Sequence, residues 1–269
     1  MFDFIFIILT YRNYEDLDSF FRNNKIPNSR VVVVNSFYDE ETKKEFQRIA
    51  QENNADFINI ENKGYGYGNN QGIAHALQYY DFKYIVVANA DVKIKKLNTE
   101  FLLSQDNNAI YAPEIKTLTG KHQNPFIINY SYFFRWLYYV AVKQNINFLK
   151  YIVYATNGVV RRLFIKLVQI FKLKKSRVYS CHGCFYLMGK EALLKLHPLY
   201  NEEMFLYNEE HFLAKKAKQN GVKVYYIPFD VAIEHFEDGS QDFSDEKSLE
   251  YSRDSYMKYF EYFKTKTNG

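Results

Sequence analysis

Two adjacent carboxylates, Glu209 and Glu210, open a predicted helix over residues 208–220, directly after the aromatic stretch 205–207. One carboxylate of such a pair can take a proton from a hydroxyl group while the other caps the helix or orients its neighbour. Acidic residues also favour the first turn of a helix because they complement the helix dipole. The pair therefore allows general-base chemistry and also allows a purely structural interpretation.

A third carboxylate, Asp91, follows a predicted buried strand over residues 84–88, within the sequence Asn89-Ala90-Asp91. Carboxylate oxygens suit Mg²⁺ or Mn²⁺, and such a cation can stabilise a departing diphosphate. An Asp in this position can equally close a turn or cap a helix. His235 follows a later strand and is a candidate metal ligand, phosphate contact or core residue.

Alternating glycines mark a further candidate site, where Gly64, Gly66 and Gly68 precede Asn69 and Asn70. Glycine lets a backbone approach a ligand closely, and either asparagine could cap the helix that we expect over residues 69–80. The amino end of that helix would favour a negatively charged group. Because the spacing matches neither the dinucleotide fingerprint nor the P-loop, the segment predicts a different ligand contact or, alternatively, a flexible turn.

Strands and helices that alternate along the chain should position these groups. The apolar pattern predicts four strands separated by three helices: strands 4–9, 30–34, 56–60 and 84–88, and helices 14–24, 39–53 and 69–80. This order indicates a mostly parallel sheet with helices on both faces. In such sheets ligands bind at the carboxyl ends of the strands, where the polar segments 10–13, 35–36 and 89–91 fall.

The middle of the chain, residues 126–177, has a different composition. Aromatic and aliphatic residues recur there at helical spacing, with basic residues and no acids between them. The basic residues are Arg135, Lys143, Lys150, Arg161, Arg162, Lys166, Lys172, Lys174, Lys175 and Arg177. This pattern is typical of a peripheral membrane surface, but a helical subdomain that packs on the sheet would also explain it. The remaining elements that we predict are strands 181–189 and 222–227, and helices 191–196 and 245–264.

Composition narrows the class of partner. The 269 residues carry a net charge of +4, which agrees with an anionic partner such as a nucleotide or phospholipid. No basic run with an RNA-motif pattern is present, so we expect no nucleic-acid partner. The apolar start of the chain lacks a basic region and a cleavage site, so we interpret it as a buried strand rather than a signal peptide.

Two cysteines, Cys181 and Cys184, cannot form a disulfide framework, which favours a reducing compartment. A zinc site would need further ligands, such as His235 or His197. On a strand the two thiols would point to opposite faces of the sheet. We therefore predict buried free cysteines.

Taken in order, these segments resemble the family 2 glycosyltransferases, particularly the rhamnosyltransferase-like branch. The most specific match is the segment 62–72, where every position agrees with that group's N-x-G-[YF]-[AG]-x-[AG]-N-N-x-G pattern. Other matches agree in order and spacing: Thr10, Tyr11 and Asn13 after the first strand, 89–92 as an N-x-D-V form of the metal motif, 183–187, 205–210 and His235. The resemblance covers about residues 3 to 240.

The resemblance implies a GT-A fold, an α/β architecture with a mostly parallel central sheet, here with a helical amphipathic insertion and a C-terminal helix. It suggests a nucleotide-sugar-binding half (1–125), the insertion (126–178) and an acceptor half with the C-terminal helix (179–269). It also implies a metal-dependent, inverting hexosyltransferase with Mn²⁺ or Mg²⁺ on Asp91 and His235, and Glu210 as the base beside Glu209. The expected donor-binding residues are Thr10, Tyr11, Arg12, Asn13, Asn35, Lys63, Gly64, Gly68, Asn69, Asn70 and Asn89.

Partners follow from the same resemblance. The expected donor is a UDP- or dTDP-sugar, although Asn35 stands where the family usually has an Asp that reads the nucleobase. The expected acceptor is a glycan or lipid-linked glycan in capsule, O-antigen or other cell-surface polysaccharide synthesis, in the cytoplasm or at the inner face of the cell membrane. Two alternatives stay open. A nucleotidyltransferase would usually place its glycine-rich loop after the first strand, and Asn89 in place of a first Asp would suit a non-catalytic nucleotide- or glycan-binding module.

Overall fold

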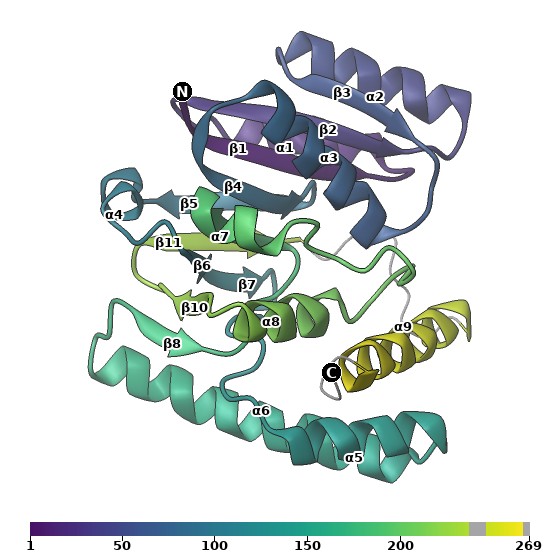
Figure 1. Ribbon diagram of the computed structural model, residues 1–269. Helices are drawn as coiled ribbons and strands as arrows, with labels where there is room; N and C mark the ends of the chain where they lie inside the picture. The colour runs from purple at the N-terminus through teal and green to yellow at the C-terminus, as the bar shows by residue number, and fades with distance from the viewer. Residues whose placement is uncertain (237–245, 266–269) are drawn as a thin grey trace.

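The computed structural model describes residues 1–236 and 246–265 (Figure 1). Its main sheet consists of β1 (Phe2–Thr10), β2 (Ser29–Ser36), β3 (Asp56–Ile60), β4 (Phe82–Asn89), β6 (Ala109–Ala112), β8 (Ser176–Val178), β9 (Phe185–Gly189) and β10 (Lys223–Tyr226). The strand order is β3-β2-β1-β4-β9-β6-β10-β8, and only β8 and β9 run against the others. A smaller sheet contains β5 (Val92–Leu97), β11 (Val231–His235) and β7 (Glu114–Thr117). The predicted α/β class with a mostly parallel sheet is confirmed.

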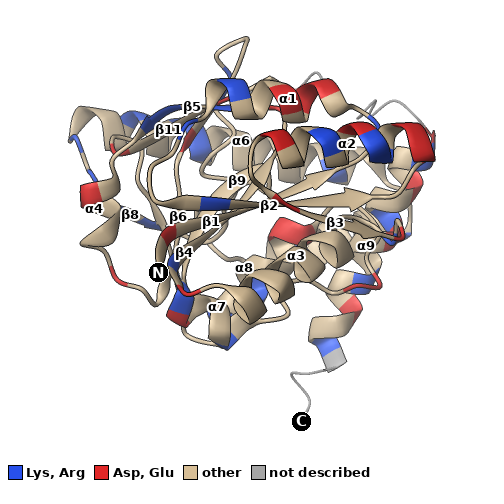
Figure 2. Ribbon diagram, turned by 90° about the horizontal axis from the view of Figure 1, so that it is seen from above, with Lys and Arg blue, Asp and Glu red and all other residues tan. Residues whose placement is uncertain are grey.

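Helices cover both faces of the main sheet, as Figure 2 shows. Side chains of β1 alternate between two cores: Ile5 and Ile7 belong to one, and Phe4 and Phe6 to the other. The first core includes residues of α3 (Tyr65–Tyr79), α7 (Lys190–Leu196) and α8 (Glu209–Gln219). The second includes residues of α1 (Tyr14–Asn23), α2 (Glu40–Glu52) and α4 (Thr99–Leu103). This alternation is what a strand buried on both faces requires.

Three further helices lie in the lower part of Figure 1. They are α5 (Tyr132–Lys143) and α6 (Asn147–Ile170), within the predicted insertion, and α9 (Glu246–Thr265) at the carboxyl end. One of them, α6, adds Val168 to the first core. An aromatic cluster joins α5, α8 and α9, in which the rings of Tyr139 and Phe260 stack at 4.0 Å. Within the described residues, no helix is both long and apolar enough to cross a bilayer.

The helix after the glycines begins earlier than predicted. Gly64, with φ of 100°, is its N-cap, and α3 starts at Tyr65. Gly66, Gly68 and Gly72 thus lie inside the helix, and a Cβ at Gly72 would lie 2.6 Å from Ile7 of β1. The prediction that Asn69 or Asn70 caps the helix is wrong, because both are buried beyond its first turn. The glycines let α3 pack closely on β1.

The cysteine prediction is confirmed in its main point. Cys181 and Cys184 are free and buried, one in each core, and burial raises the pKa of Cys181 to about 12. The predicted strand 181–189 is shorter than expected, because β9 begins only at Phe185. Residues 181–184 instead form an irregular segment that leads into the sheet.

Candidate active site

The polar ends of the central strands meet at one edge, as the sequence predicted. Thr10 pairs with Asn35 across β1 and β2, and Leu9 pairs with Asn89 across β1 and β4. The Asn35 amide donates to Asn59 Oδ1 at 2.7 Å, and Thr10 Oγ1 donates to the Val34 carbonyl at 3.2 Å. Asn35 Oδ1 is buried and lacks a hydrogen-bond partner. At the carboxyl ends of β1 and β2, the side-chain oxygen of Asn35 is therefore available to accept a hydrogen bond.

The loop after β1 supplies a cation at the same edge. Arg12 has φ of 65°, and its exposed guanidinium lies over the ring of Tyr38, 4.5 Å from the centroid. Tyr11 contacts the same ring edge-on, while the Asn13 side chain donates to Asp16. The other predicted diphosphate contact, Lys63, pairs at 2.9 Å with Glu61, and both side chains are exposed. Both cations remain accessible from solvent.

Asp91 and His235 lie side by side although they are far apart in sequence. The antiparallel register of β5 and β11 pairs His235 with Val92, the neighbour of Asp91. His235 Nε2 lies 3.3 Å from Asp91 Oδ2, yet this buried nitrogen makes no hydrogen bond. Nδ1 is 2.8 Å from Gln123 Oε1. Since the amide oxygen can only accept, Nδ1–H donates to it, and Nε2 faces the Asp91 carboxylate without a hydrogen bond.

This pair fits a divalent cation. A carboxylate oxygen and an imidazole nitrogen are both common ligand atoms for divalent cations, and here the two lie next to one another. The described residues contain no cluster of three His, Cys, Asp or Glu side chains that could hold a metal. The remaining ligands would thus have to come from water or a bound diphosphate, which is how Mg²⁺ usually binds.

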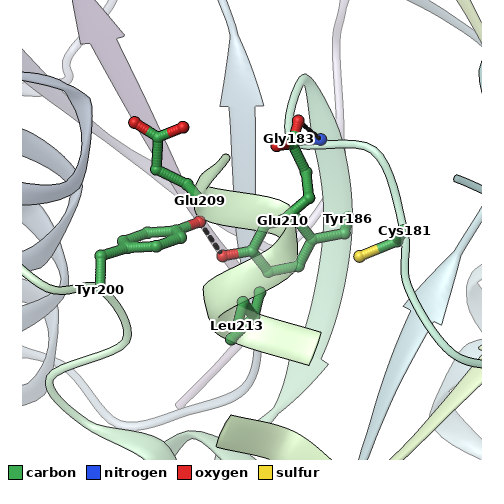
Figure 3. Close-up of a pocket in the computed structure, with 7 residues that line it drawn as sticks. All are labelled: Cys181, Gly183, Tyr186, Tyr200, Glu209, Glu210 and Leu213. Carbon is green, nitrogen blue, oxygen red and sulfur yellow. Dashed lines mark hydrogen bonds between the residues drawn. The ribbon is translucent and has the colours of Figure 1, made fainter. Parts of the chain in front are cut away.

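The acid pair begins α8 and faces a small pocket (Figure 3). The pocket is lined by Cys181, Gly183, Tyr186, Tyr200, Glu209, Glu210 and Leu213. The hydroxyl groups of Tyr186 and Tyr200 lie 2.5 Å apart on its wall. Glu210 Oε1 accepts a hydrogen bond from the backbone N–H of Gly183 at 3.2 Å. The pocket is too small for a nucleotide sugar.

Burial separates the protonation states of the two acids. It raises the pKa of Glu209 to about 8, and the charge of Glu210 adds to the shift. Burial also raises the pKa of Glu210, but the N–H of Gly183 stabilises its charged form. Glu209 Oε1 has no hydrogen-bond partner. Near neutral pH Glu209 therefore retains a proton, and the hydrogen bond from Gly183 favours the charged form of Glu210.

The segment 181–184 joins the acid pair to the Asp91–His235 pair. The ring centroid of His182 lies 6.1 Å from that of His235. The backbone N–H of His182 donates to Asn124 Oδ1 at 2.7 Å. Burial lowers the pKa of His182 to about 3, so its ring is neutral. Next to it, a Cβ on Gly183 would lie only 3.0 Å from Glu210 Oε1. Glycine here permits the close approach of the Glu210 carboxylate.

The amino end of α3 also contacts the acid-pair region. Tyr65 donates its N–H to the Phe205 carbonyl at 2.8 Å and its hydroxyl to the Gly183 carbonyl at 3.0 Å. A Cβ at Gly64 would overlap Phe205. The Asn70 amide donates to the Tyr200 carbonyl at 3.0 Å. Gly64 and Asn70 thus hold the segment that carries the acids, and any contact of theirs with a donor stays a prediction.

The other predicted donor-binding residues of α3 contact neighbouring parts of the protein. Gly68 packs against Leu9, and the Asn69 amide donates to the Tyr65 carbonyl at 3.0 Å. Sequence reasoning missed Gln123, Asn124 and His182, which fix the site from irregular segments. The only signal for them was the Cys-His-Gly-Cys sequence, which suggested zinc or redox chemistry instead.

Comparison with known proteins identifies the fold. No protein-family model matches the chain, and no curated protein matches it in sequence. GalNAc-T7, solved with UDP, GalNAc and Mn²⁺, aligns with a TM-score of 0.61 and 12% identity, over 97% of this chain and 48% of that one. TarS of S. aureus in complex with UDP-GlcNAc aligns with a TM-score of 0.54 and 15% identity, over 90% of this chain and 61% of that one.

A further structure of S. aureus TarS aligns with a TM-score of 0.52 and 13% identity, over 87% of this chain and 36% of that chain. The chain thus spans less than two thirds of the length of each of these structures. All three are GT-A glycosyltransferases, and at these identities the likeness shows a shared fold. The α/β architecture of this chain, with its large, mostly parallel sheet, is that of the GT-A glycosyltransferases.

Proposed function

We propose that the protein is a metal-dependent glycosyltransferase that moves a sugar from a nucleotide donor to a hydroxyl group. The observation that carries this proposal is the placement of two unlike carboxylate sites on either side of residues 181–184. On one side, Asp91 and the unpartnered Nε2 of His235 suit a cation. On the other, Glu210 suits a base. The shared fold supports the same function.

In the proposed reaction, Glu210 removes the proton of the acceptor hydroxyl as its oxygen attacks the anomeric carbon. The bond from that carbon to the diphosphate breaks, and the nucleoside diphosphate leaves with the electron pair. A divalent cation held by Asp91 and His235 would neutralise the charge that develops on the diphosphate. A single displacement of this kind inverts the anomeric configuration. The fold by itself allows either stereochemistry, since GalNAc-T7 is a retaining enzyme.

The strand ends are the proposed donor site. Arg12 and Lys63 are the accessible cations that would contact the diphosphate, with Thr10, Asn35 and Asn89 at the edge beside them. We propose a UDP- or dTDP-sugar as donor and a glycan or lipid-linked glycan of the cell surface as acceptor. The reaction would take place in the cytoplasm, at the inner face of the membrane.

Thermal unfolding tests the donor site directly. A ligand that binds only the folded state raises the melting temperature. We expect UDP or dTDP to do so in the presence of Mn²⁺, and much less in its absence, with GDP and CMP as comparison nucleotides. If no nucleotide shifts the melting temperature with or without the metal, the proposal fails. A clear shift without sugar transfer would instead indicate a non-catalytic binding module.

A further inference from the structure

The outward side of α6 is mostly apolar, with Arg162 and Lys166 as its charged members, whereas a surface helix normally turns a polar side outward. Phe148 and Ile170, near its two ends, are 70% and 71% exposed. Between them, exposed apolar side chains recur about every turn: Tyr151, Val159, Leu163 and Leu167. The inward side is also apolar, since Ile165 and Val168 are buried. A helix that is apolar on both sides normally lies in a buried environment.

Helix α5 extends this apolar surface. It packs against α6, and the two are joined by a short connection at residues 144–146. Tyr132, Phe133 and Trp136 are exposed on it, at 63%, 61% and 44%. We call nine of the exposed apolar residues of both helices the outer face: Tyr132, Phe133, Trp136, Phe148, Tyr151, Val159, Leu163, Leu167 and Ile170. Tyr and Trp are the residues that prefer the boundary between lipid and water.

The charged residues on the two helices of the outer face have one sign. Residues 115–190 contain no Asp or Glu. Two arginines of this stretch, Arg135 and Arg161, are largely withdrawn into the protein, where they donate to Tyr130 and to the His122 carbonyl. The exposed basic residues of this stretch are Lys121, Lys143, Arg162, Lys166, Lys172, Lys174 and Arg177. Arg162 and Lys166 lie between apolar members of the outer face on α6.

We infer that the outer face docks on an anionic lipid surface. A lipid bilayer supplies an apolar environment for the aromatic and aliphatic residues and negative headgroups for the lysines and arginines. A second copy of the chain would satisfy the apolar residues alone, because it would bring the same positive charges with no acid to pair with them. Charge complementarity therefore selects the lipid surface over self-association.

The inward side of α6 connects this surface to the candidate active site. Asn157 donates to the Phe126 carbonyl at 3.1 Å, and Arg161 donates to the His122 carbonyl at 2.5 Å. Between these two anchors lies Gln123, which holds His235. An α-helix with its side chains is about 10–12 Å across, so the site would stand about one helix diameter from the lipid. If the proposed function holds, the acceptor is an amphiphile whose hydroxyl group lies near the headgroups.

Co-sedimentation with vesicles tests this inference without any donor or metal. We expect the full chain to bind vesicles of phosphatidylcholine with phosphatidylglycerol at least tenfold more tightly than vesicles of phosphatidylcholine alone. The double variant Val159→Glu and Leu163→Glu should lose at least tenfold of this binding, as should Arg162→Glu with Lys166→Glu. The matched control is Tyr79→Glu with Leu194→Glu, two residues that are each 60% exposed on α3 and α7.

All replaced side chains are exposed or point to solvent, so each variant should melt close to the parent protein. Equal binding by the control and by Val159→Glu with Leu163→Glu would overturn the inference, as would no binding by the parent chain. A dimer in lipid-free buffer that this double variant converts to monomer would show that a second copy covers the outer face instead. Nucleotide stabilisation is measured without vesicles, so a failure of the proposed function would be seen separately.

Discussion

Two regions of the site use carboxylates under opposite conditions. Glu209 and Glu210 face Tyr186, Tyr200 and Leu213, where burial favours the protonated form of an acid. Asp91 instead faces Nε2 of His235, a buried nitrogen without a hydrogen bond, where a positive charge would be stabilised. The same functional group is therefore suited to hold a proton in one place and a cation in the other. The surroundings, rather than the residue type, decide between these roles.

Replacing Asp91 should have the largest effect. In Asp91→Ala the cation would lose its carboxylate ligand, and with it the compensation of the diphosphate charge. We expect the rate of transfer to fall by roughly a thousandfold or more, since a bound cation stabilises the transition state by several kcal/mol. The Mn²⁺-dependent shift of the melting temperature with nucleotide should disappear as well. Retention of that shift would place the cation elsewhere and remove the contrast between the two regions.

Glu210→Gln should separate the two regions most clearly. The amide keeps the shape of the side chain but cannot take a proton, so transfer should fall by about 10²- to 10⁴-fold. Nucleotide stabilisation with Mn²⁺ should stay at the parental value, because the cation site is untouched. Steady-state rates and melting curves on the same preparation check both points. Full activity of this variant would exclude Glu210 as the base.

The bond from Gln123 to His235 allows a finer test of the cation region. Gln123→Met keeps the side chain's length but removes the amide oxygen that fixes the imidazole. Loss of such an orienting partner typically lowers metal affinity by 10- to 100-fold. The Mn²⁺ concentration needed for half-maximal nucleotide stabilisation should rise accordingly, while the melting temperature without metal changes little. An unchanged Mn²⁺ requirement would mean that His235 is not a ligand.

The smallest effect is on stability, and it tests the acid pair alone. The pKa of Glu209 is raised in the folded state to about 8, so the folded protein holds more protons than the unfolded chain between about pH 4.5 and pH 8. The free energy of unfolding should therefore fall by a few kcal/mol as the pH rises through this range. Glu209→Gln should lose much of that slope. Parallel curves for both proteins would show that Glu209 does not retain its proton.

Much of the donor half could be predicted from sequence because its signals are local. The apolar run of β1 and the polar periodicity of α2 each predicted the right element in the right place. The start of α3 was predicted too late, because glycine disfavours helix by itself. Close packing on β1, which only the sheet reveals, overrides that preference at Gly68 and Gly72.

The site was predictable where topology alone decides it. Strand ends of a parallel sheet must share an edge, and Thr10, Asn35 and Asn89 do so. The role of His235 stayed open in the sequence, because only the register of β11 with β5 places it beside Asp91. Gln123 and His182 lie in irregular segments without periodicity, so nothing local to them indicates their contacts.

The contacts that complete the site join parts of the chain that are synthesised at very different times. Three hydrogen bonds show this. Tyr65 bonds to Gly183, which is 118 residues later in the chain, and Asn70 bonds to Tyr200, 130 residues later. Gln123 bonds to His235, 112 residues later. Contacts of such long sequence separation form slowly in folding. A nascent chain can thus build its first strands and helices while both carboxylate regions are still incomplete. The candidate active site would be complete only late in synthesis, when most of the polypeptide has left the ribosome.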